Sequence, residues 1–561
     1  MNLKALPLAA CTFPLACILL VSGVAFAQPP SPATPATAPT PATAPAPATA
    51  PTPATVPTPA TAPTPATAPT PATAPRPATA PTPAPPPRAQ PQSPAIADPA
   101  TRFVAQMAVK GSPTYAPNLP KRAHRCLITD SGAVGDGTTV NTRAIQDAID
   151  KCAALKGGGT LVVPKGTFRS GAIFLKQGVN LLVEKDGVLK GTTYPDDYPQ
   201  IKSRWEGTEE EYTASFVNAE GVTGLDISGP GTIDGSGDEW MAKSGFRRAT
   251  PQGPGGPPAP ATAPAIGLFR QPEGPLDSQV PIAAPNSANL VNGLPAMRHG
   301  RPRLIGIQNS KDVRIAGLYL HNQAIWCLFI LYSENVEIDG VTIAAEHNIP
   351  SSDGIDIDSS KHVHINHVYI EDGDDCISIK SGKDADGLRV NRPAEDILIE
   401  NSHFAYGQGG VAMGSETSGG IRNVTTLNCL FDAGNWAPIR FKTQPSRGGV
   451  VENITYKDIV LHNTRQAFEM NMEWRMVGTR QPDSNPLPVV RNVKIVNVTG
   501  DVMSVGTIHG LAGSPIQGVT FENCHITATR GFRLDHARGV DLTGLKIDVK
   551  QGEPVTTTDV Q

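Results

Sequence analysis

The segment VRIAGLYLHNQAIWCLFILYSENVEIDGVTI, residues 313–343, decides the fold because it contains one pattern twice. VRIAGLYL and VEIDGVTI each read as two short strands of alternating apolar and polar residues that meet at a polar corner. From residue 313 onward, successive copies begin 21 to 39 residues apart. The copies begin at Leu225, Val313, Val336, Val363, Ile397, Val424, Ile454, Val493, Val519 and Val540.

A repeat of this length made only of strands and corners is typical of a β-solenoid, with one copy per coil. A β-sandwich also contains short alternating strands, but a paired-strand unit repeated this often favours the solenoid. One helical pattern precedes the repeats, at about 142–155, and glycines 157–159 end it. The predicted fold class is all-β: a parallel β-helix, with this helix capping its N-terminal end.

The chain of 561 residues divides by composition into five parts. Residues 1–27 read as a signal peptide, and 28–98 repeat ATAPTP and predict a disordered, polyproline-II-rich linker. The β-helix domain is expected at 99–549, interrupted by a long Pro-, Ala- and Gly-rich loop at about 241–301. Residues 550–561 are expected to be a flexible tail.

The first 27 residues contain Lys4, an apolar run from Phe13 to Phe26 and the cleavage pattern Ala25-Phe26-Ala27. A lipoprotein-like box ends at Cys11, but too little hydrophobic sequence precedes it to favour a lipid anchor. We therefore expect a secreted protein, extracellular or periplasmic. No later segment is long and apolar enough to span a bilayer, so no membrane contact is expected. We expect a monomer.

The net charge of −4 gives no basic face, which argues against a nucleic-acid partner. Export permits disulfides, and Cys126 and Cys152, which flank one short segment, are the expected pair. Cys327, Cys376 and Cys429 lie in apolar strand-like runs and are expected to be buried hydrophobic residues. No cysteine belongs to a C-x-x-C pair, so a zinc site is not expected.

A second stretch, EDGDDCISIKSG at 371–382, places four acids beside a strand. Aligned by its apolar alternation, Asp375-Cys376-Ile377-Ser378-Ile379 matches Asp353-Gly354-Ile355-Asp356-Ile357 without gaps. Equivalent positions of neighbouring coils stack about 4.8 Å apart. Asp353 is therefore predicted to lie over Asp375, whereas Asp374 should point differently because strand side chains alternate.

The next coils extend this face of the solenoid. Gly407 to Met413 places Gln408 beside the acids, and Ile439 to Thr443 directs Arg440 and Lys442 outward. The face thus carries an acid, two acids, an amide and two bases on four successive coils.

This arrangement indicates acid/base hydrolysis of a glycosidic bond. Two stacked carboxylates can activate a water, and a third carboxyl group, kept protonated by its neighbours, can protonate the leaving oxygen, as in an inverting glycosidase. Arg440 and Lys442 would bind a carboxylate on the sugar. Two other interpretations stay open: a calcium site of Asp372, Asp374 and Asp375, although the EF-hand spacing is absent, and a solvated turn, which we prefer for Glu371 and Asp372.

The chain from about 124 to 549 resembles the polygalacturonases, the family 28 glycoside hydrolases, which have a right-handed parallel β-helix. The family motifs N-T-D, D-D, G-H-G and R-I-K correspond in order to the following segments: Ser351-Ser352-Asp353, Asp374-Asp375, Gly407-Gln408-Gly409 and Arg440-Phe441-Lys442. The openings GAVGDGTTVNT and GGGTLVVPKGTF also look like the family's first coil.

The resemblance implies that Asp374 is the general acid, that Asp353 and Asp375 activate water, and that Arg440 and Lys442 bind the substrate carboxylate. It implies a pectin polysaccharide substrate and neither a metal nor an organic cofactor. Ser351 replaces the family Asn. Gln408 replaces the family His. A glutamine amide can still donate and accept hydrogen bonds, but it cannot carry a positive charge as histidine can.

Several functions stay open beside hydrolysis of polygalacturonan. They are a rhamnogalacturonan or xylogalacturonan hydrolase on the same fold, a calcium-dependent pectate lyase, and a non-catalytic pectin-binding solenoid. Exo-action is slightly favoured, since the long loop could close one end of the site and Gly414 to Gly420 looks similar to exo-acting members.

Overall fold

A computed structural model describes residues 116–243, 300–475 and 481–561. The expected signal peptide, the linker and most of the 241–301 loop lie outside these residues. The described residues all belong to the second of two units, Pro87–Gln561. In the described part of the chain, no helix is long and apolar enough to cross a membrane.

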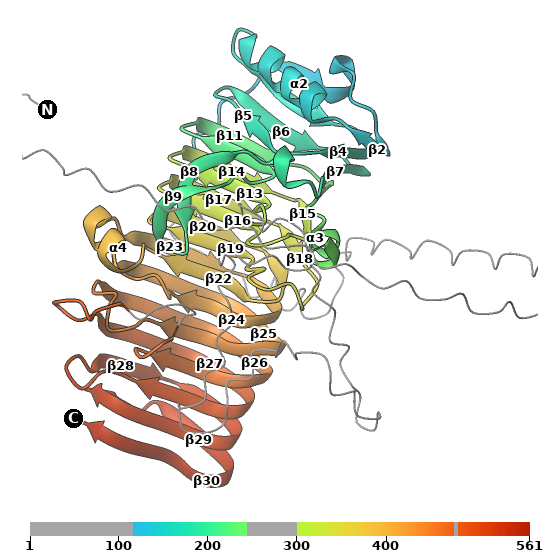
Figure 1. The fold of residues 1–561 in the computed structure, drawn as a ribbon. Coiled ribbons are helices and arrows are strands. Elements are labelled where there is room, and N and C mark those ends of the chain that lie inside the picture. The colour runs from blue at the N-terminus through green and yellow to red at the C-terminus, as the bar shows by residue number, and fades with distance from the viewer. Residues whose placement is uncertain (1–115, 244–299, 476–480) are drawn as a thin grey trace, which may run out of the picture. The chain divides into compact units, whose positions relative to one another are not determined.

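The predicted β-solenoid is confirmed: the second unit is a parallel β-helix (Figure 1). One coil consists of β13 (Ile305–Gln308), β14 (Lys311–Ala316) and β15 (Tyr319–His321). Each of these strands pairs in parallel with the strand three later, in the next coil. The coil has three strands rather than the two expected.

The register agrees with the repeat. Each residue that begins a copy lies beside the one that begins the next, from Leu225 beside Val313 to Val493 beside Val519. Isoleucines two positions later form a ladder inside the coil, and Ile315, Ile338 and Ile365 are fully buried. The alternation predicts the register because a shift by one residue would expose that ladder.

The other elements follow in chain order, and the last strands are long because each continues round a corner from one sheet into the next. They are β1 (His124–Leu127), β2 (Asp136–Val140), β3 (Gly159–Val163), β4 (Gly166–Ser170), β5 (Ile173–Leu175), β6 (Val179–Val183), β7 (Gly187–Gly191), β8 (Gln200–Trp205), β9 (Thr208–Thr213), β10 (Val217–Glu220), β11 (Thr223–Ser228), β12 (Thr232–Asp234), β16 (Leu328–Leu331), β17 (Glu334–Asp339), β18 (Thr342–Ala344), β19 (Ile355–Asp358), β20 (Lys361–Asn366), β21 (Tyr369–Glu371), β22 (Asp375–Lys380), β23 (Ala394–Glu400), β24 (His403–Met413), β25 (Ile421–Lys442), β26 (Val450–Asn471), β27 (Val489–His509), β28 (Ile516–Glu522), β29 (Cys524–Arg538) and β30 (Leu545–Val560).

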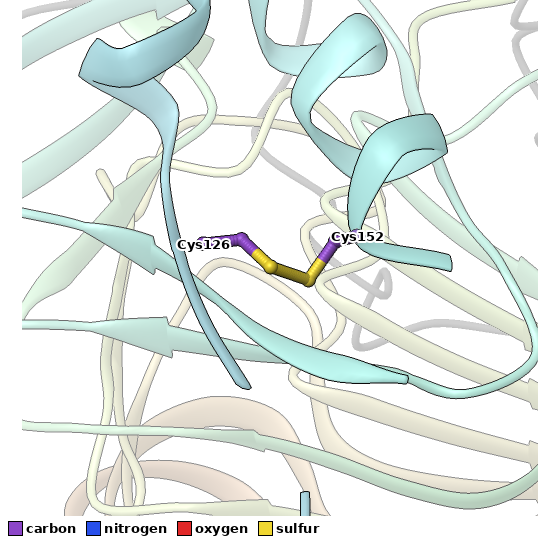
Figure 2. Close-up of a disulfide and its surroundings, with 2 residues drawn as sticks. All are labelled: Cys126 and Cys152. Atoms are coloured by element: carbon purple, nitrogen blue, oxygen red, sulfur yellow. A yellow bond between two sulfur atoms is a disulfide. The ribbon is translucent and has the colours of Figure 1, made fainter. Parts of the chain in front are cut away.

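The expected helix is present as α2 (Thr142–Ala154), which buries Ile145, Ala148, Ile149 and Cys152. Cys152 forms the predicted disulfide with Cys126 (Figure 2). The cysteines expected to be buried are buried. The role of helix α2 as a cap on the N-terminal end of the solenoid stays a prediction. Two short helices were not expected, α3 (Gly237–Lys243) and α4 (Asp384–Val390), because seven residues are too few to show a helical period.

The prediction of a flexible tail at 550–561 is wrong. Residues Leu545–Val560 form β30, which pairs in parallel with β29, and Phe532 lies beside Val555. The polar composition of this segment misleads because, among the described residues, no further strand covers the outer side of β30. Its Val- and Thr-rich sequence still favours a strand, and it covers the otherwise unpaired edge of β29.

An antiparallel hairpin, β8–β9, is the main departure from the solenoid. It packs on the outward face of β13, β16 and β19, where Arg204 Nη1 lies 2.7 Å from Asp358 Oδ1 and Ser203 Oγ lies 2.9 Å from Gln308 Oε1. Trp205 and Tyr212 of the hairpin form a buried cluster with residues of those coils: Ile325, Trp326, Phe329 and Leu331. This face of the sheet is therefore covered by protein.

Candidate active site

The three predicted acids come together next to the hairpin. Asp353 precedes β19, Asp374 directly precedes β22, and Asp375 is the first residue of β22. The register pairs Ile355 with Ile377 and so confirms the predicted stacking of the two strands. One oxygen from each of the three carboxyl groups lies within 4.8 Å of the others. Asp374 does not diverge as alternation predicted, because it lies in the corner before the strand.

Asp375 is held by the two predicted cations. Arg440 Nη1 lies 3.2 Å from Asp375 Oδ1, and Lys442 Nζ donates to Asp375 Oδ2. Arg440 Nε also donates to Glu469 Oε2 at 2.7 Å. Both cations point out of the coil as expected, yet their side chains are only 3% and 8% exposed. The Trp474 ring packs against both, with its centroid 4.7 Å from Arg440 Cζ.

Burial and charge separate the pKa values of the three acids. Burial and the nearby Asp375 raise the pKa of Asp374 above its usual range. Burial also acts to raise the pKa of Asp375, but Lys442 and Arg440 outweigh it and the pKa lies below its ordinary value. Burial, Asp356 and Asp374 raise the pKa of Asp353 well above its ordinary value. Asp374 and Asp353 thus favour the protonated form and Asp375 the ionised form.

The raised pKa of Asp353 differs from the sequence-based expectation that Asp353 and Asp375 form an ionised pair. The difference arises because Arg440 and Lys442 contact Asp375, whereas among the described residues the cation paired with Asp353 is Lys380, whose Nζ lies 3.9 Å from Asp353 Oδ2.

Lys380 is a site residue that the sequence did not reveal. Its ammonium lies 3.4 Å from Asp356 Oδ1 and 3.3 Å from Glu416 Oε2, as well as near Asp353, and its side chain is 6% exposed. Burial raises the pKa of Asp356 to about 7, whereas Lys380 is the main cause that lowers the pKa of Glu416 to about 2 against the effect of burial. An outward lysine on a strand normally reaches water; here the hairpin and Trp326, 4.7 Å away, cover it.

The acidic corner is not a solvated turn throughout. Glu371 is partly exposed, as expected, and its carboxylate pairs with His347. Asp372 is fully buried, so that expectation is wrong for it. Its Oδ1 accepts from the Asp374 backbone N–H at 3.2 Å, and burial raises its pKa well above the ordinary value. Asp372 turns inward under the corner and orders the backbone that carries Asp374.

The two positions that depart from the family motifs lie beside the acids. The Gln408 backbone N–H donates to the Asp374 carbonyl at 2.6 Å, and Gln408 Nε2 lies 3.4 Å from the Gly373 carbonyl. Ser351 has a left-handed backbone, with φ of 55°. Its neighbour Ser352 accepts from the Gly373 backbone N–H through Oγ at 2.8 Å. These contacts link the corners that carry Asp353 and Asp374.

The spacing of the three carboxyl oxygens would also suit a metal ion, but their surroundings fit one poorly. Lys442 and Arg440 already neutralise Asp375, and Asp353 and Asp374 favour the protonated form, which is a poor ligand. Asp372, the other acid of the possible calcium set, is buried under the corner. The arrangement instead places protonated carboxyl groups beside one ionised carboxylate, and a proton donor and a base are the two groups that acid/base hydrolysis of a glycosidic bond uses.

The chain is similar in sequence to a known family of glycosyl hydrolases and to several curated proteins. The family model described as "Glycosyl hydrolases family 28" matches residues 293–541, and a second model, "Rhamnogalacturonase A/epimerase, pectate lyase-like", matches 127–193. A probable polygalacturonase of Vitis vinifera is 28% identical over 72% of this chain and 74% of its own. An exo-poly-alpha-D-galacturonosidase of Dickeya chrysanthemi is 29% identical over 62% of this chain and 57% of its own.

Among solved structures, a hyperthermoactive exopolygalacturonase from Thermotoga maritima is 26% identical, with a TM-score of 0.61, and the match covers 83% of this chain and 96% of that one. The match to the family model runs through the coils that carry the acids and cations described above. The chain is therefore similar to glycosyl hydrolases family 28 in the region that carries the candidate site.

Proposed function

We propose that this glycoside hydrolase cleaves α-1,4 bonds between galacturonic acid residues of polygalacturonan, with inversion and from one end of the chain. The observation that carries the proposal is the group of Asp353, Asp374 and Asp375 beside two buried cations. Three carboxyl groups with opposed pKa shifts supply acid and base, and cations beside them suit an anionic sugar.

In this proposal Asp374 is the general acid, because it favours the protonated form and is the least buried of the three. Asp375, kept ionised by Lys442 and Arg440, takes a proton from the attacking water. Asp353 lies beside both and holds that water through a hydrogen bond. The water oxygen bonds to the anomeric carbon as the bond between that carbon and the leaving oxygen breaks; one proton passes from Asp374 to the leaving oxygen and one from the water to Asp375.

Lys442 and Arg440 are also proposed to bind the substrate carboxylate. Both lie on the outward side of β25, and both contact Asp375. A carboxylate of the sugar placed against Lys442 would share its charge with Asp375. We therefore expect Lys442, the more exposed of the two, to contribute more to substrate binding than Arg440, which Glu469 also holds.

The hairpin β8–β9 supports action at chain ends. An endo-acting enzyme needs sugar subsites on both sides of the cleaved bond. On the N-terminal side of the acids, the outward residues of β16 and β19 are buried beneath the hairpin, and Phe329, Leu331, Asp356 and Asp358 are each at most 2% exposed. The polysaccharide would then continue only over the coils that follow β22.

Digestion of polygalacturonate tests the proposal. We expect reducing sugar in the presence of EDTA, no unsaturated product absorbing near 235 nm, and inverted anomeric configuration in the first product detected by NMR. Mono- or digalacturonate from the first minutes would support exo-action, and a ladder of oligomers would overturn it. Loss of activity with EDTA, or an unsaturated product, would show a lyase instead.

A substrate panel separates the other family activities. Faster release from rhamnogalacturonan or xylogalacturonan than from polygalacturonate would overturn the choice of substrate. Binding to polygalacturonate without any hydrolysis would show a pectin-binding solenoid. We further propose that the protein is exported as a monomer after removal of residues 1–27, which N-terminal sequencing of the exported protein and light scattering can test.

A further inference from the structure

A row of side chains continues from the proposed acid along the stack of coils. The register places Gly409 beside Asp375 and Ala437 beside Gly409. The residues immediately before them therefore stack as well, so that Asp374, Gln408 and Trp436 occupy equivalent positions on three successive coils. On the fourth coil, Arg465 lies with its guanidinium carbon 3.8 Å from the centre of the Trp436 ring.

Arg465 differs from the other cations near the site. Arg440 and Lys442 are buried and paired with carboxylates, whereas Arg465 is partly exposed and has no carboxylate or hydrogen-bond partner among the described residues. Contact with the ring of Trp436 limits the conformations of the guanidinium by a cation–π interaction. An arginine held in this way presents its fork of N–H donors at little further cost in entropy, which suits bidentate binding of a carboxylate.

We propose that Arg465, held by Trp436, binds the carboxylate of a galacturonate residue remote from the cleaved bond. The inference rests on the proposed function. At about 4.8 Å per coil, three coils separate Arg465 from Asp374 by about 14 Å along the stack. A sugar bonded directly at the cleavage position does not extend that far. Arg465 therefore contacts only longer substrates, on the side of the acids that the hairpin leaves uncovered.

The test compares substrates of different length with the variant Arg465→Gln. For hexagalacturonate we expect the KM to rise about tenfold, the loss typical of one charge-assisted hydrogen-bonded pair. The kcat should change less than twofold, because Arg465 does not touch the reacting atoms. For digalacturonate both constants should stay within twofold of the wild type. Arg465→Lys should have a KM between those of the wild type and Arg465→Gln, because lysine keeps the positive charge but lacks the paired N–H donors of arginine.

Arg491→Gln is the matched control, because Arg491 pairs with Glu452 on another sheet of the solenoid. It should leave all constants unchanged. An equal rise in KM for the dimer and the hexamer, or no rise for either, would overturn the role of Arg465. If the wild-type enzyme does not hydrolyse hexagalacturonate at all, the proposed function itself fails, and the two failures are thereby distinguished.

Discussion

Lys442 on β25 reaches across one intervening coil to donate to Asp375 on β22, so the charge of the proposed base depends on a residue 67 positions later in the chain. Lys442 lowers the pKa of Asp375. Without Lys442, that pKa should rise, and the ionised base should be lost at a higher pH. The acidic limb of kcat/KM against pH should therefore move upward in Lys442→Met, by about one pH unit. The partly exposed Lys361, which pairs with Glu334, provides the control, and a limb that moves equally in Lys361→Met would contradict the prediction.

Asp374→Asn should lower kcat for polygalacturonate at least about a hundredfold, because the amide cannot donate the proton that the leaving oxygen needs. The KM and the melting temperature should change little, since Asp374 is the least buried of the three acids. Steady-state kinetics together with calorimetry checks both statements. Asp548→Asn, an exposed acid on β30, serves as the control. A variant that keeps more than a tenth of wild-type kcat would exclude Asp374 as the acid.

Gly409 leaves room for the proposed base. A Cβ added to Gly409 would lie 2.3 Å from Asp375 Oδ1 and 3.1 Å from Arg440 Cδ. Gly409→Ala should displace the carboxylate and lower kcat/KM about a hundredfold, as small misplacements of reacting groups do. The control is Gly513→Ala, whose new Cβ would meet only the end of the Leu487 side chain. If Gly409→Ala keeps full activity, Asp375 does not need its observed position.

Lys380 should matter more for stability than its single charge suggests. Lys380→Met leaves Asp356 and Glu416 buried without their cation, and should lower the free energy of unfolding by about 3–5 kcal/mol. Adding Glu416→Gln to that variant should recover part of the loss, because one of the uncompensated charges is then removed. Chemical denaturation of the wild type, both single variants and the double variant gives the coupling. Additive losses would show that the two residues do not interact.

The sequence predicted most of the fold because each coil repeats one local rule, an apolar pair two residues apart after a polar corner. The same rule aligned Asp353 with Asp375. It could not predict what lies on the outside of the coils. The hairpin β8–β9 consists largely of polar residues, and its position depends on Arg204 meeting Asp358, 154 residues later in the chain.

Because the hairpin covers this face of the sheet, the sequence alone does not indicate Lys380 as a buried site residue. On an uncovered sheet an outward lysine would be solvated. The burial of Asp372 could not be predicted for a related reason: an acidic residue in a corner that contains glycine is usually exposed to solvent. Here Asp372 turns under the corner, and Gly354 lies directly beneath it; a Cβ at Gly354 would meet Asp372 Oδ2 at 3.0 Å.

The disulfide between Cys126 and Cys152 makes the two ends of the solenoid unequal. It joins α2 to the first coil across 26 residues, a loop whose closure stabilises a folded chain by about 3–4 kcal/mol. At the other end, in the described part of the chain, β30 is held only by its pairing with β29. In a stack where each coil touches only its neighbours, opening should therefore start at β30 and proceed towards β22. Amide hydrogen exchange should show this order, and reducing the disulfide should let exchange begin from both ends.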